Sequence, residues 1–353
     1  MIIDLIFLFF ISVLTSLGVI LVTKKIFLFF HILDNPWKYQ KKRAPIPYSM
    51  GVIFFICFFI LSYFFVESNY KLYLLWVFWG IITIISFIDD RLNISPQIRL
   101  LMQIMIGGII GLTAIKVWYV SNIFWGIIDL DTFFIEIFQY KIYIISLLFT
   151  IFWYVFIFNA LNWTDGIQWN TSGLSLISFF VLFLLWLKLY FTDEYVWGVE
   201  NAKFILSLST ILISILIPFF YFDFKEKILM GDSWTMFLWF ILASLAIISW
   251  WKIATVLVVF WIYAIDAIYV IVTRLKNKKN PLSWDFTHLH HRLLDLWMSK
   301  NQVLGFLFSF SFLFWVSSLF LNKEWKMLLF VFMIFFVIFS PKILSKFLKY
   351  EKK

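Results

Sequence analysis

Long apolar runs, separated by short polar segments, divide this chain almost from end to end. Polar and apolar positions do not alternate with a period of two within the runs, so the pattern predicts helices rather than strands. Each run is about 16–20 residues long, close to the length that crosses a bilayer core. Eleven runs are candidate spans, approximately 2–22, 51–66, 72–88, 100–115, 142–158, 174–190, 204–222, 235–250, 253–272, 304–320 and 325–340.

The composition supports a membrane protein. Hydrophobic residues make up 63% of the chain and charged residues 14%, and the mean hydropathy is +0.95. A soluble globule needs a polar surface that so few polar residues cannot supply. We therefore predict an all-α polytopic bundle of about eleven transmembrane helices, in one integral-membrane domain over residues 1–353.

Three local features refine this prediction. The segment 116–141 is too polar and interrupted for a span, and it is left as an external loop or a re-entrant piece. Cys57 is the single cysteine, so an intrachain disulfide is excluded. The first run, 2–22, carries Asp4 instead of a basic leading segment, so we expect a retained span rather than a signal peptide.

The basic residues gather on one side of the predicted topology. Of the 29 lysines and arginines, 21 fall on the side reached after the first run. The segments on that side are 23–50, 89–99, 159–173, 223–234, 273–303 and 341–353. The positive-inside rule makes this side cytoplasmic, with the N-terminus outside and the C-terminus inside. The net charge of +9 belongs mostly to this face, and without a soluble basic domain nucleic-acid binding is not expected.

Four polar constellations all fall on the predicted cytoplasmic side. They are Asp89-Asp90, the segment 159–166, the segment 230–233, and a histidine cluster made of His288, His290, His291 and Arg292. Chance would scatter such residues over both faces. Their shared placement indicates a functional surface at the cytoplasmic face of a membrane.

The carboxylates in these constellations suit a hard metal ion. Adjacent carboxylates at a helix end repel each other unless a cation compensates, as Asp89 and Asp90 would. Together with Asp232 they supply the oxygen ligands that Mg²⁺ prefers. The structural alternatives are that the pair merely ends its helix, and that Asp232 is an N-cap following a glycine.

The remaining constellations suit anions. Asn162 and Asp165 fit either a binding loop or a turn before the next span. The spacing in the histidine cluster does not match the zinc-protease pattern, so donation to phosphate is favoured over a zinc site or a loop facing lipid headgroups. Carboxylates for a metal beside imidazoles for an anion predict phosphoryl chemistry at the membrane surface.

In order and approximate spacing, these motifs resemble the polyprenyl-phosphate N-acetylhexosamine-1-phosphate transferases of glycosyltransferase family 4 type. The resemblance covers about 34–300 and has five parts. They are Asp34-x-Pro36; Asp89-Asp90 with Pro96, Arg99 and Gln103; Asn159-x-x-Asn162-x-x-Asp165-Gly166; Met230-Gly231-Asp232-Ser233; and Asp266, Arg274 and Asp285-x-x-His288-x-His290-His291-Arg292. The last part is similar to the branch that initiates common antigen, teichoic acid and O-antigen, rather than to the triple-histidine peptidoglycan translocases.

The resemblance implies a reaction and its partners. An N-acetylhexosamine 1-phosphate, with N-acetylglucosamine 1-phosphate favoured, would pass from a UDP-sugar to undecaprenyl phosphate at the cytoplasmic face of a bacterial inner membrane. UMP would leave, and the lipid product would start a wall or lipopolysaccharide glycan. The cofactor would be Mg²⁺, with Mn²⁺ as a substitute.

The resemblance also implies residue roles. The catalytic and metal-binding residues would be Asp89, Asp90 and Asp232. The nucleotide-binding residues would be Asn159, Asn162 and Asp165. The residues binding the diphosphate and sugar would be His288, His290, His291 and Arg292.

The chain departs from the family pattern at several places. Gln168 and Trp169 stand where an Asp-Gly pair is usual, and Trp234 begins the pair that replaces Gly-Ser. The first loop lacks the usual Arg-Lys-x-His, although Lys42 and Arg43 supply charge there. The sugar preference and the oligomeric state, a homodimer included, are therefore left open. An inactive relative acting as a scaffold and a small-solute transporter are the alternative functions.

Overall fold

The computed structural model describes residues 1–36, 43–48, 50–92, 94–121, 126–162, 169–192, 199–229, 231–249, 253–280 and 287–350. Each of the eleven predicted spans corresponds to a helix in these ranges. Six helices are long and apolar enough to cross a membrane, and four further apolar helices are shorter. The protein is an all-α polytopic membrane protein, as predicted.

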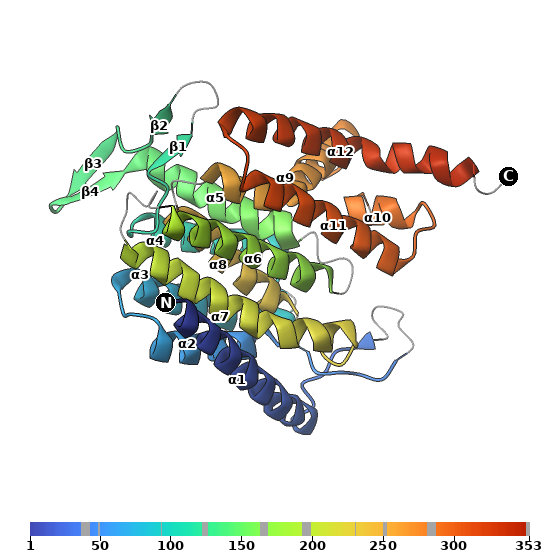
Figure 1. Cartoon of the computed structure of the whole chain (residues 1–353), viewed down its shortest axis with the longest axis horizontal. Coiled ribbons are helices and arrows are strands. Elements are labelled where there is room, and N and C mark those ends of the chain that lie inside the picture. The colour runs from blue at the N-terminus through green and yellow to red at the C-terminus, as the bar shows by residue number, and fades with distance from the viewer. Residues whose placement is uncertain are drawn as a thin grey trace. The chain divides into compact units, whose positions relative to one another are not determined.

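Twelve helices and four short strands lie within the described residues (Figure 1). The helices are α1 (Ile2–Phe29), α2 (Gly51–Phe65), α3 (Tyr70–Leu92), α4 (Pro96–Gly111), α5 (Ile144–Asn162), α6 (Asn170–Phe191), α7 (Val199–Phe224), α8 (Asp232–Ile248), α9 (Ile253–Lys276), α10 (Leu289–Leu294), α11 (Lys300–Ser318) and α12 (Lys323–Tyr350). The strands are β1 (Tyr119–Ser121), β2 (Ile127–Asp129), β3 (Phe134–Ile137) and β4 (Tyr140–Tyr143). Most predicted spans gain a turn at their ends, and the short helix α10 was not predicted.

The helices form two compact units. The first unit comprises Met1–Ile94 and Ser178–Leu245, and the second comprises Ser95–Ile177 and Ala246–Lys353.

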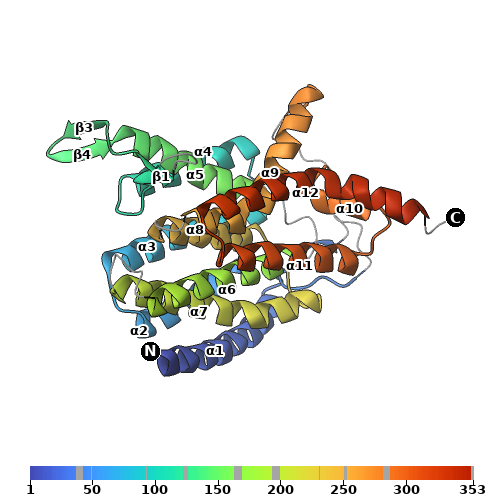
Figure 2. The same cartoon turned by 45° about the horizontal axis from the view of Figure 1, so that its top comes forward.

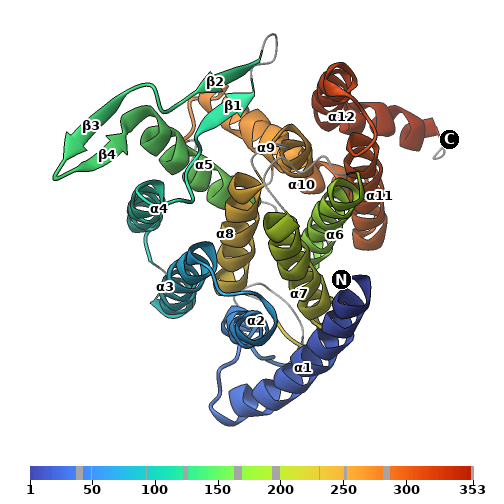
Figure 3. The same cartoon turned by 60° about the vertical axis from the view of Figure 1, so that its left-hand side comes forward.

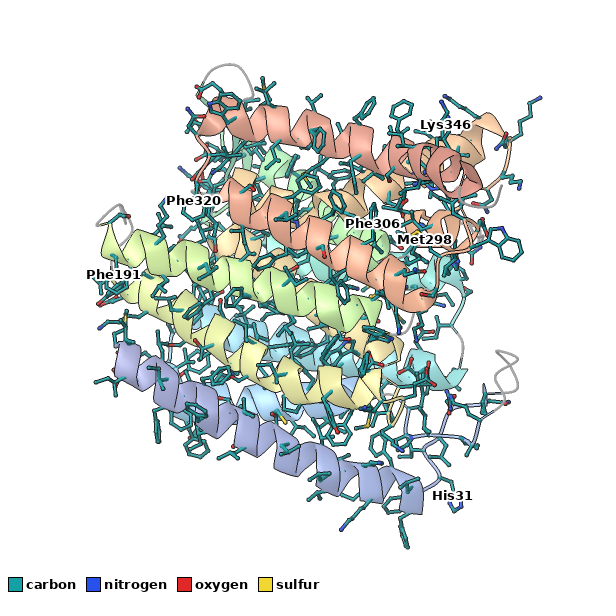
Figure 4. All side chains as sticks on the ribbon, turned by 45° about the vertical axis from the view of Figure 1, so that its right-hand side comes forward. His31, Phe191, Met298, Phe306, Phe320 and Lys346 are labelled. Carbon is teal, nitrogen blue, oxygen red and sulfur yellow. The ribbon has the colours of Figure 1, made fainter. Side chains whose placement is uncertain are left out.

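In the first unit, α2 is surrounded by α1, α3 and α7, and α1 also runs along α7 (Figure 3). One stripe of α1 is buried, with Ser12 and Ser16 at its centre, and small side chains allow close helix approach in lipid. The remaining faces of α1 expose large apolar side chains, as a lipid-facing helix requires. Figure 4 shows His31 and Phe191 at opposite ends of this unit.

An aromatic core joins α2, α3, α7 and α8. The Phe54 ring lies 4.4 Å from that of Trp234 and 4.6 Å from that of Phe237, measured between centroids. Trp79 stacks on Phe237 with centroids 3.6 Å apart. This packing fixes the start of α8 relative to α3 and α7, which carry or adjoin the acidic motifs.

In the second unit, α4 and α5 pack closely because glycines line α4. A Cβ at Gly107 would meet the Ile151 Cα at 3.1 Å, and one at Gly111 would meet the Leu147 Cδ1 at 2.7 Å. This Gly-x-x-x-Gly spacing is typical of helices that pack in membranes. The close approach aligns the cytoplasmic ends that were predicted for the two helices.

The remaining helices of the second unit surround α9 and α10. Helix α9 contacts α5, α11 and α12, and α10 contacts α11 and α12 (Figure 2). Phe306 of α11 stacks on Phe336 of α12 with centroids 5.4 Å apart. Figure 4 places Met298 and Lys346 at one end of this helix pair and Phe320 at the other.

The segment 116–141 holds β-hairpins instead of a further span. Strand β1 pairs antiparallel with β2, and β3 pairs antiparallel with β4. Phe138 and Gln139 connect β3 to β4 with φ of +46° and +70°, as a tight two-residue hairpin turn requires. Helix α5 follows β4 directly, so the hairpin lies at the end of α5 opposite to Asn159.

Candidate functional site

Two residue groups carry the predicted chemistry, one in each unit. We call Tyr48, Asp89, Asp90, Gly231 and Asp232 of the first unit the carboxylate region. We call Asp266, His288, His290, His291 and Arg292 of the second unit the histidine region.

The two adjacent aspartates of α3 have different surroundings. Asp89 is buried, and its Oδ1 accepts a hydrogen bond of 2.8 Å from the Ile94 backbone amide, just past the helix end. Asp90 is partly exposed, and its Oδ1 accepts a hydrogen bond of 3.1 Å from the Tyr48 hydroxyl. Asp89 therefore holds the connection between α3 and α4, while Asp90 faces the other elements of the carboxylate region.

Gly231 brings the second acidic motif against Asp90. A Cβ at this position would lie 2.7 Å from the Asp90 Oδ2, and the backbone φ is +77°. Both facts require glycine, since other residues rarely adopt this φ and none fits the space. The Asp89-Asp90 motif and the Gly231-Asp232 motif thus meet in the first unit, as the prediction requires. Asp90 and Gly231 are 141 positions apart in the sequence.

Asp232 begins α8 rather than capping it. The Gly231 carbonyl accepts hydrogen bonds from the backbone amides of Trp234 and Thr235, so the cap lies at the glycine. A carboxylate in the first turn is favoured by the helix dipole. The side chain of Asp232 lies outside the described part of the structure, so its predicted metal ligation stays a prediction.

The first loop, which includes residues 43–48, contacts both acidic motifs. The sequence pattern did not predict these contacts. Arg43 binds the buried Asp34 through both carboxylate oxygens, at 3.1 and 2.7 Å. The loop then delivers Pro47, whose carbonyl accepts the Leu229 amide at 2.8 Å, and Tyr48, whose hydroxyl reaches Asp90. The charge of Arg43 is thus balanced inside the loop, and Tyr48 is a site residue that the analysis of motifs missed.

Trp234 departs from the family pattern, which has a glycine at this position, and packing explains the departure. Its side chain is fully buried, and its ring stacks on Phe219 with centroids 4.7 Å apart. The bulky residue therefore fills the aromatic core beneath Gly231, and it leaves the acidic motifs in contact.

The donors of the carboxylate region fit a hard cation. Carboxylate oxygens with room for water and phosphate are what Mg²⁺ prefers. Among side chains that the structure describes, no group of three or more acidic, histidine or cysteine residues could hold a metal by itself. Asp89 and Asp90 are two of the three predicted ligands, and the third is Asp232.

One buried carboxylate organises the histidine region. The Asp266 Oδ2 lies 2.9 Å from the His288 Nδ1, and both side chains are almost fully buried. The Asp266 Oδ1 accepts hydrogen bonds from the Leu289 amide at 2.8 Å and from the Arg292 Nη2 at 3.3 Å. Arg292 also donates to the Val337 carbonyl and lies over the Tyr269 ring. Arg292 is therefore held by the protein in addition to its predicted role at an anion.

His290 is a neutral member of the histidine region. Burial, reinforced by the adjacent His291, lowers the pKa of His290 to about 3, so this imidazole is neutral at physiological pH. Its Nε2 is buried and has no hydrogen-bond partner among the described residues. The ring of the half-buried His291 lies 4.2 Å from that of His290. A neutral, unpaired imidazole can still bind a ligand through one hydrogen bond, but it adds no positive charge.

The nucleotide motif is only partly described. The Asn159 Nδ2 donates to the Gln103 Oε1 and to the Val155 carbonyl, both at 2.7 Å, so it links α5 to α4. Asn162 is the half-buried last residue of α5. Asp165 and Gln168 lie outside the described residues, and their predicted roles stay predictions.

Trp169 occupies a glycine-like conformation before α6. Its φ is +60°, a value typical of the glycine that the family pattern has there. Its ring contacts Phe308 of α11, and the Lys300 ammonium lies 5.7 Å from the ring centroid. Trp169 therefore takes a backbone conformation that glycine adopts readily.

The fold is that of a polytopic membrane protein, and comparison with known proteins identifies its family. The chain belongs to glycosyl transferase family 4, whose family model matches residues 72–250. This range includes Asp89, Asp90, the nucleotide motif and Asp232, and it ends before the histidine cluster.

Relatives extend the similarity beyond that range. The chain is 24% identical over 348 residues to a probable undecaprenyl-phosphate N-acetylglucosaminyl 1-phosphate transferase of Bacillus subtilis, covering 96% of this chain and 90% of the relative. It is 24% identical to an undecaprenyl-phosphate alpha-N-acetylglucosaminyl 1-phosphate transferase of Yersinia pestis, with 81% and 76% covered. It is 25% identical to a phospho-N-acetylmuramoyl-pentapeptide-transferase of Borreliella afzelii, with 77% and 80% covered. Similarity to the family is thus shown for nearly the whole chain.

Proposed function

We propose that the protein transfers N-acetylglucosamine 1-phosphate from UDP-N-acetylglucosamine to undecaprenyl phosphate, at the cytoplasmic face of a bacterial inner membrane. The single observation that carries this proposal is the contact between Gly231 and Asp90, which brings two acidic motifs of the family together. The names of the Bacillus subtilis and Yersinia pestis relatives support the choice of donor and acceptor.

The proposed reaction exchanges one phosphoanhydride bond for another. An oxygen of the undecaprenyl phosphate forms a bond to the β-phosphorus of the UDP-sugar. The bond between that phosphorus and the oxygen bridging to the α-phosphate breaks, and UMP leaves with the bridging oxygen. Transfers of this kind depend mainly on positioning and on neutralising phosphate charge.

The carboxylate region would supply the metal-dependent part of this reaction. Asp90 and Asp232 would hold Mg²⁺, with Asp89 fixing the adjoining connection between helices. When bound, the ion would neutralise charge on the phosphate oxygens. Tyr48 would keep the Asp90 carboxylate in one orientation through its hydroxyl.

The histidine region would bind the diphosphate. His288 and His291 would donate to phosphate oxygens, and the neutral His290 would donate one hydrogen bond without adding charge. Asn159 and Asn162, at the end of α5, would adjoin the nucleotide together with Asp165. We propose the initiating branch of the family over the peptidoglycan branch because the cluster has the His-x-His-His order.

The alternatives make different predictions. A small-solute transporter would carry polar residues in the middle of its spans, whereas the site residues here gather at helix ends or in connections, Asp266 excepted. An inactive scaffold would keep the fold without turnover, so only an activity assay separates it from an enzyme.

The test is a transfer assay with the purified protein in lipid vesicles. The mixture contains undecaprenyl phosphate, Mg²⁺ and one radiolabelled donor from a panel of UDP-sugars. We expect labelled lipid and UMP in equal amounts, with UDP-N-acetylglucosamine the best donor, and we expect EDTA to stop the reaction. The exposed variant Asp129→Asn, in the hairpin, serves as the matched acidic control and should keep full activity. If no donor gives UMP, the protein is not an active transferase.

A further inference from the structure

Asp266 is a buried carboxylate in α9 to which the proposed reaction assigns no part. Its side chain is 5% exposed, and it lies about three turns before the helix end at Lys276. A buried carboxylate is costly unless donors satisfy it, and polar groups inside membrane helices commonly serve function. The donors that satisfy Asp266 identify which residues it acts on.

All the donors recorded for Asp266 come from the histidine cluster or its helix. The Oδ2 faces the His288 Nδ1 at 2.9 Å, and the Oδ1 accepts the Leu289 amide at 2.8 Å and the Arg292 Nη2 at 3.3 Å. One side chain of α9 thus fixes the backbone at the start of α10 and two side chains on either side of His290.

We infer that Asp266 is a positioning residue, which orients His288 and Arg292 so that the histidine cluster can bind the diphosphate of the donor. This inference rests on the proposed function. Because Asp266 accepts at the His288 Nδ1, that nitrogen carries a proton, and the ring donates to a phosphate oxygen through Nε2 when it takes up a second proton. A bound diphosphate would favour that second proton, because an opposite charge nearby stabilises the charged form of a group.

The arrangement balances charge as well as orientation. Asp266 offsets the positive charge of Arg292, so the guanidinium can lie close to the imidazoles in a partly buried setting. His290, lying between His288 and Arg292 in the sequence, is neutral because of its burial.

A purely structural role is the competing explanation, since Asp266 also attaches α10 to α9. The variant Asp266→Asn separates the two roles. The Leu289 amide and Arg292 both donate to the Oδ1 side, so the new amide nitrogen takes the Oδ2 side. There it donates to the His288 Nδ1, which reverses the tautomer of the neutral ring.

The experiment combines kinetics with nitrogen NMR of histidine-labelled protein. The chain has four histidines, so assignment by single substitution is practical. We expect wild-type His288 to carry its proton on Nδ1, and Asp266→Asn to move it to Nε2. In metal sites, the partners that orient a ligating histidine contribute about 10- to 100-fold, and we expect KM for the UDP-sugar to rise by a similar factor here, with kcat changed less.

A double-mutant cycle decides whether Asp266 acts through His288. In a His288→Gln background, Asp266→Asn should raise KM by a further factor of less than about two, because the side chain that Asp266 orients is already absent. The exposed Asp295→Asn on the same loop is the control and should leave KM unchanged. Melting temperatures of all variants, measured without substrate, report any structural loss separately.

Three results would overturn the inference. The first is a wild-type His288 protonated on Nε2 alone. The second is an unchanged KM in Asp266→Asn. The third is a rise in KM on Asp266→Asn that is as large in the His288→Gln background as in wild type. An inactive wild-type protein would instead refute the proposed function, while the tautomer measurement would still test the orientation. If Asp266→Asn does not fold, the wild-type tautomer remains the deciding result.

Discussion

The carboxylate region and the histidine region position charged groups in opposite ways. In the carboxylate region, backbone atoms determine the geometry: the Pro47 carbonyl, the Ile94 amide and the bare Cα of Gly231. In the histidine region, one buried side chain, Asp266, determines it. Asp90 stays partly exposed, whereas His288 and His290 are buried. Changes at the partly exposed Asp90 should therefore impair chemistry at small cost in stability, and changes in the histidine region should alter both affinity and stability.

The largest expected effect separates the adjacent aspartates. Asp90→Asn removes the charge that faces Gly231, so we expect kcat to fall about 1,000-fold with an unchanged melting temperature. Asp89→Ala leaves the Ile94 amide without its acceptor and should lower the free energy of unfolding by about 1–3 kcal/mol. Steady-state kinetics and thermal melts on both variants measure the two effects. Equal kinetic and stability losses in the two variants would remove the distinction between them.

Gly231→Ala tests whether backbone contact sets the carboxylate geometry. The added Cβ would lie 2.7 Å from the Asp90 Oδ2, and the φ of +77° is unfavourable for alanine. A small displacement of a reacting group costs about 100-fold in rate, and we expect that loss in kcat. Gly18→Ala in α1, where nothing lies within 4 Å of the added Cβ, is the matched control. Normal turnover by Gly231→Ala would show that the contact is not needed.

The pH dependence of stability tests the burial of His290. Its folded pKa, about 3, lies below its unfolded value of 6.5, so the unfolded chain binds the proton more readily. The contribution of the neutral His290 to the free energy of unfolding is therefore present above pH 6.5 and is lost as the pH falls toward 3. Between pH 6.5 and pH 5 the loss should reach about 2 kcal/mol. Thermal melts of wild type and His290→Leu at these two pH values measure it, and the variant should lose this part of the dependence. An identical slope in both proteins would assign the pH effect to other groups.

The smallest effect concerns the first loop. Tyr48→Phe removes the hydrogen bond to Asp90 and keeps the ring, so kcat should fall about 5-fold, the value of one modest hydrogen bond. Tyr63→Phe, on an exposed tyrosine of α2, is the matched control. A Tyr48→Phe enzyme with wild-type kcat would show that Asp90 needs no support from the loop.

Hydropathy and charge predicted the helices well because lipid enforces simple rules. All eleven predicted spans are helices, since spanning backbone must satisfy its own hydrogen bonds. The same rules say little about extramembrane segments, which explains why the hairpins at 119–143 and the helix α10 were missed. Phe138 and Gln139 form a turn without the glycine or asparagine that usually signals one.

The candidate site was predictable in its residue types but not in its contacts. The motifs named Asp90, Gly231 and His288, yet no periodicity indicated that Gly231 lies against Asp90 or that Asp266 holds His288. Tyr48 gave no signal, because a single tyrosine in a loop resembles any interfacial aromatic residue. Long-range contacts of this kind depend on helix packing, which local sequence patterns do not encode.

The most direct test of a metal-dependent transfer at the carboxylate region compares wild type with Asp232→Asn in lipid vesicles. Both proteins receive UDP-N-acetylglucosamine, undecaprenyl phosphate and Mg²⁺, and UMP and lipid-linked sugar are counted together. We predict equal amounts of the two products from wild type, and a loss of about 1,000-fold in both from Asp232→Asn, with the melting temperature unchanged. UMP release by Asp232→Asn at the wild-type rate would contradict the account.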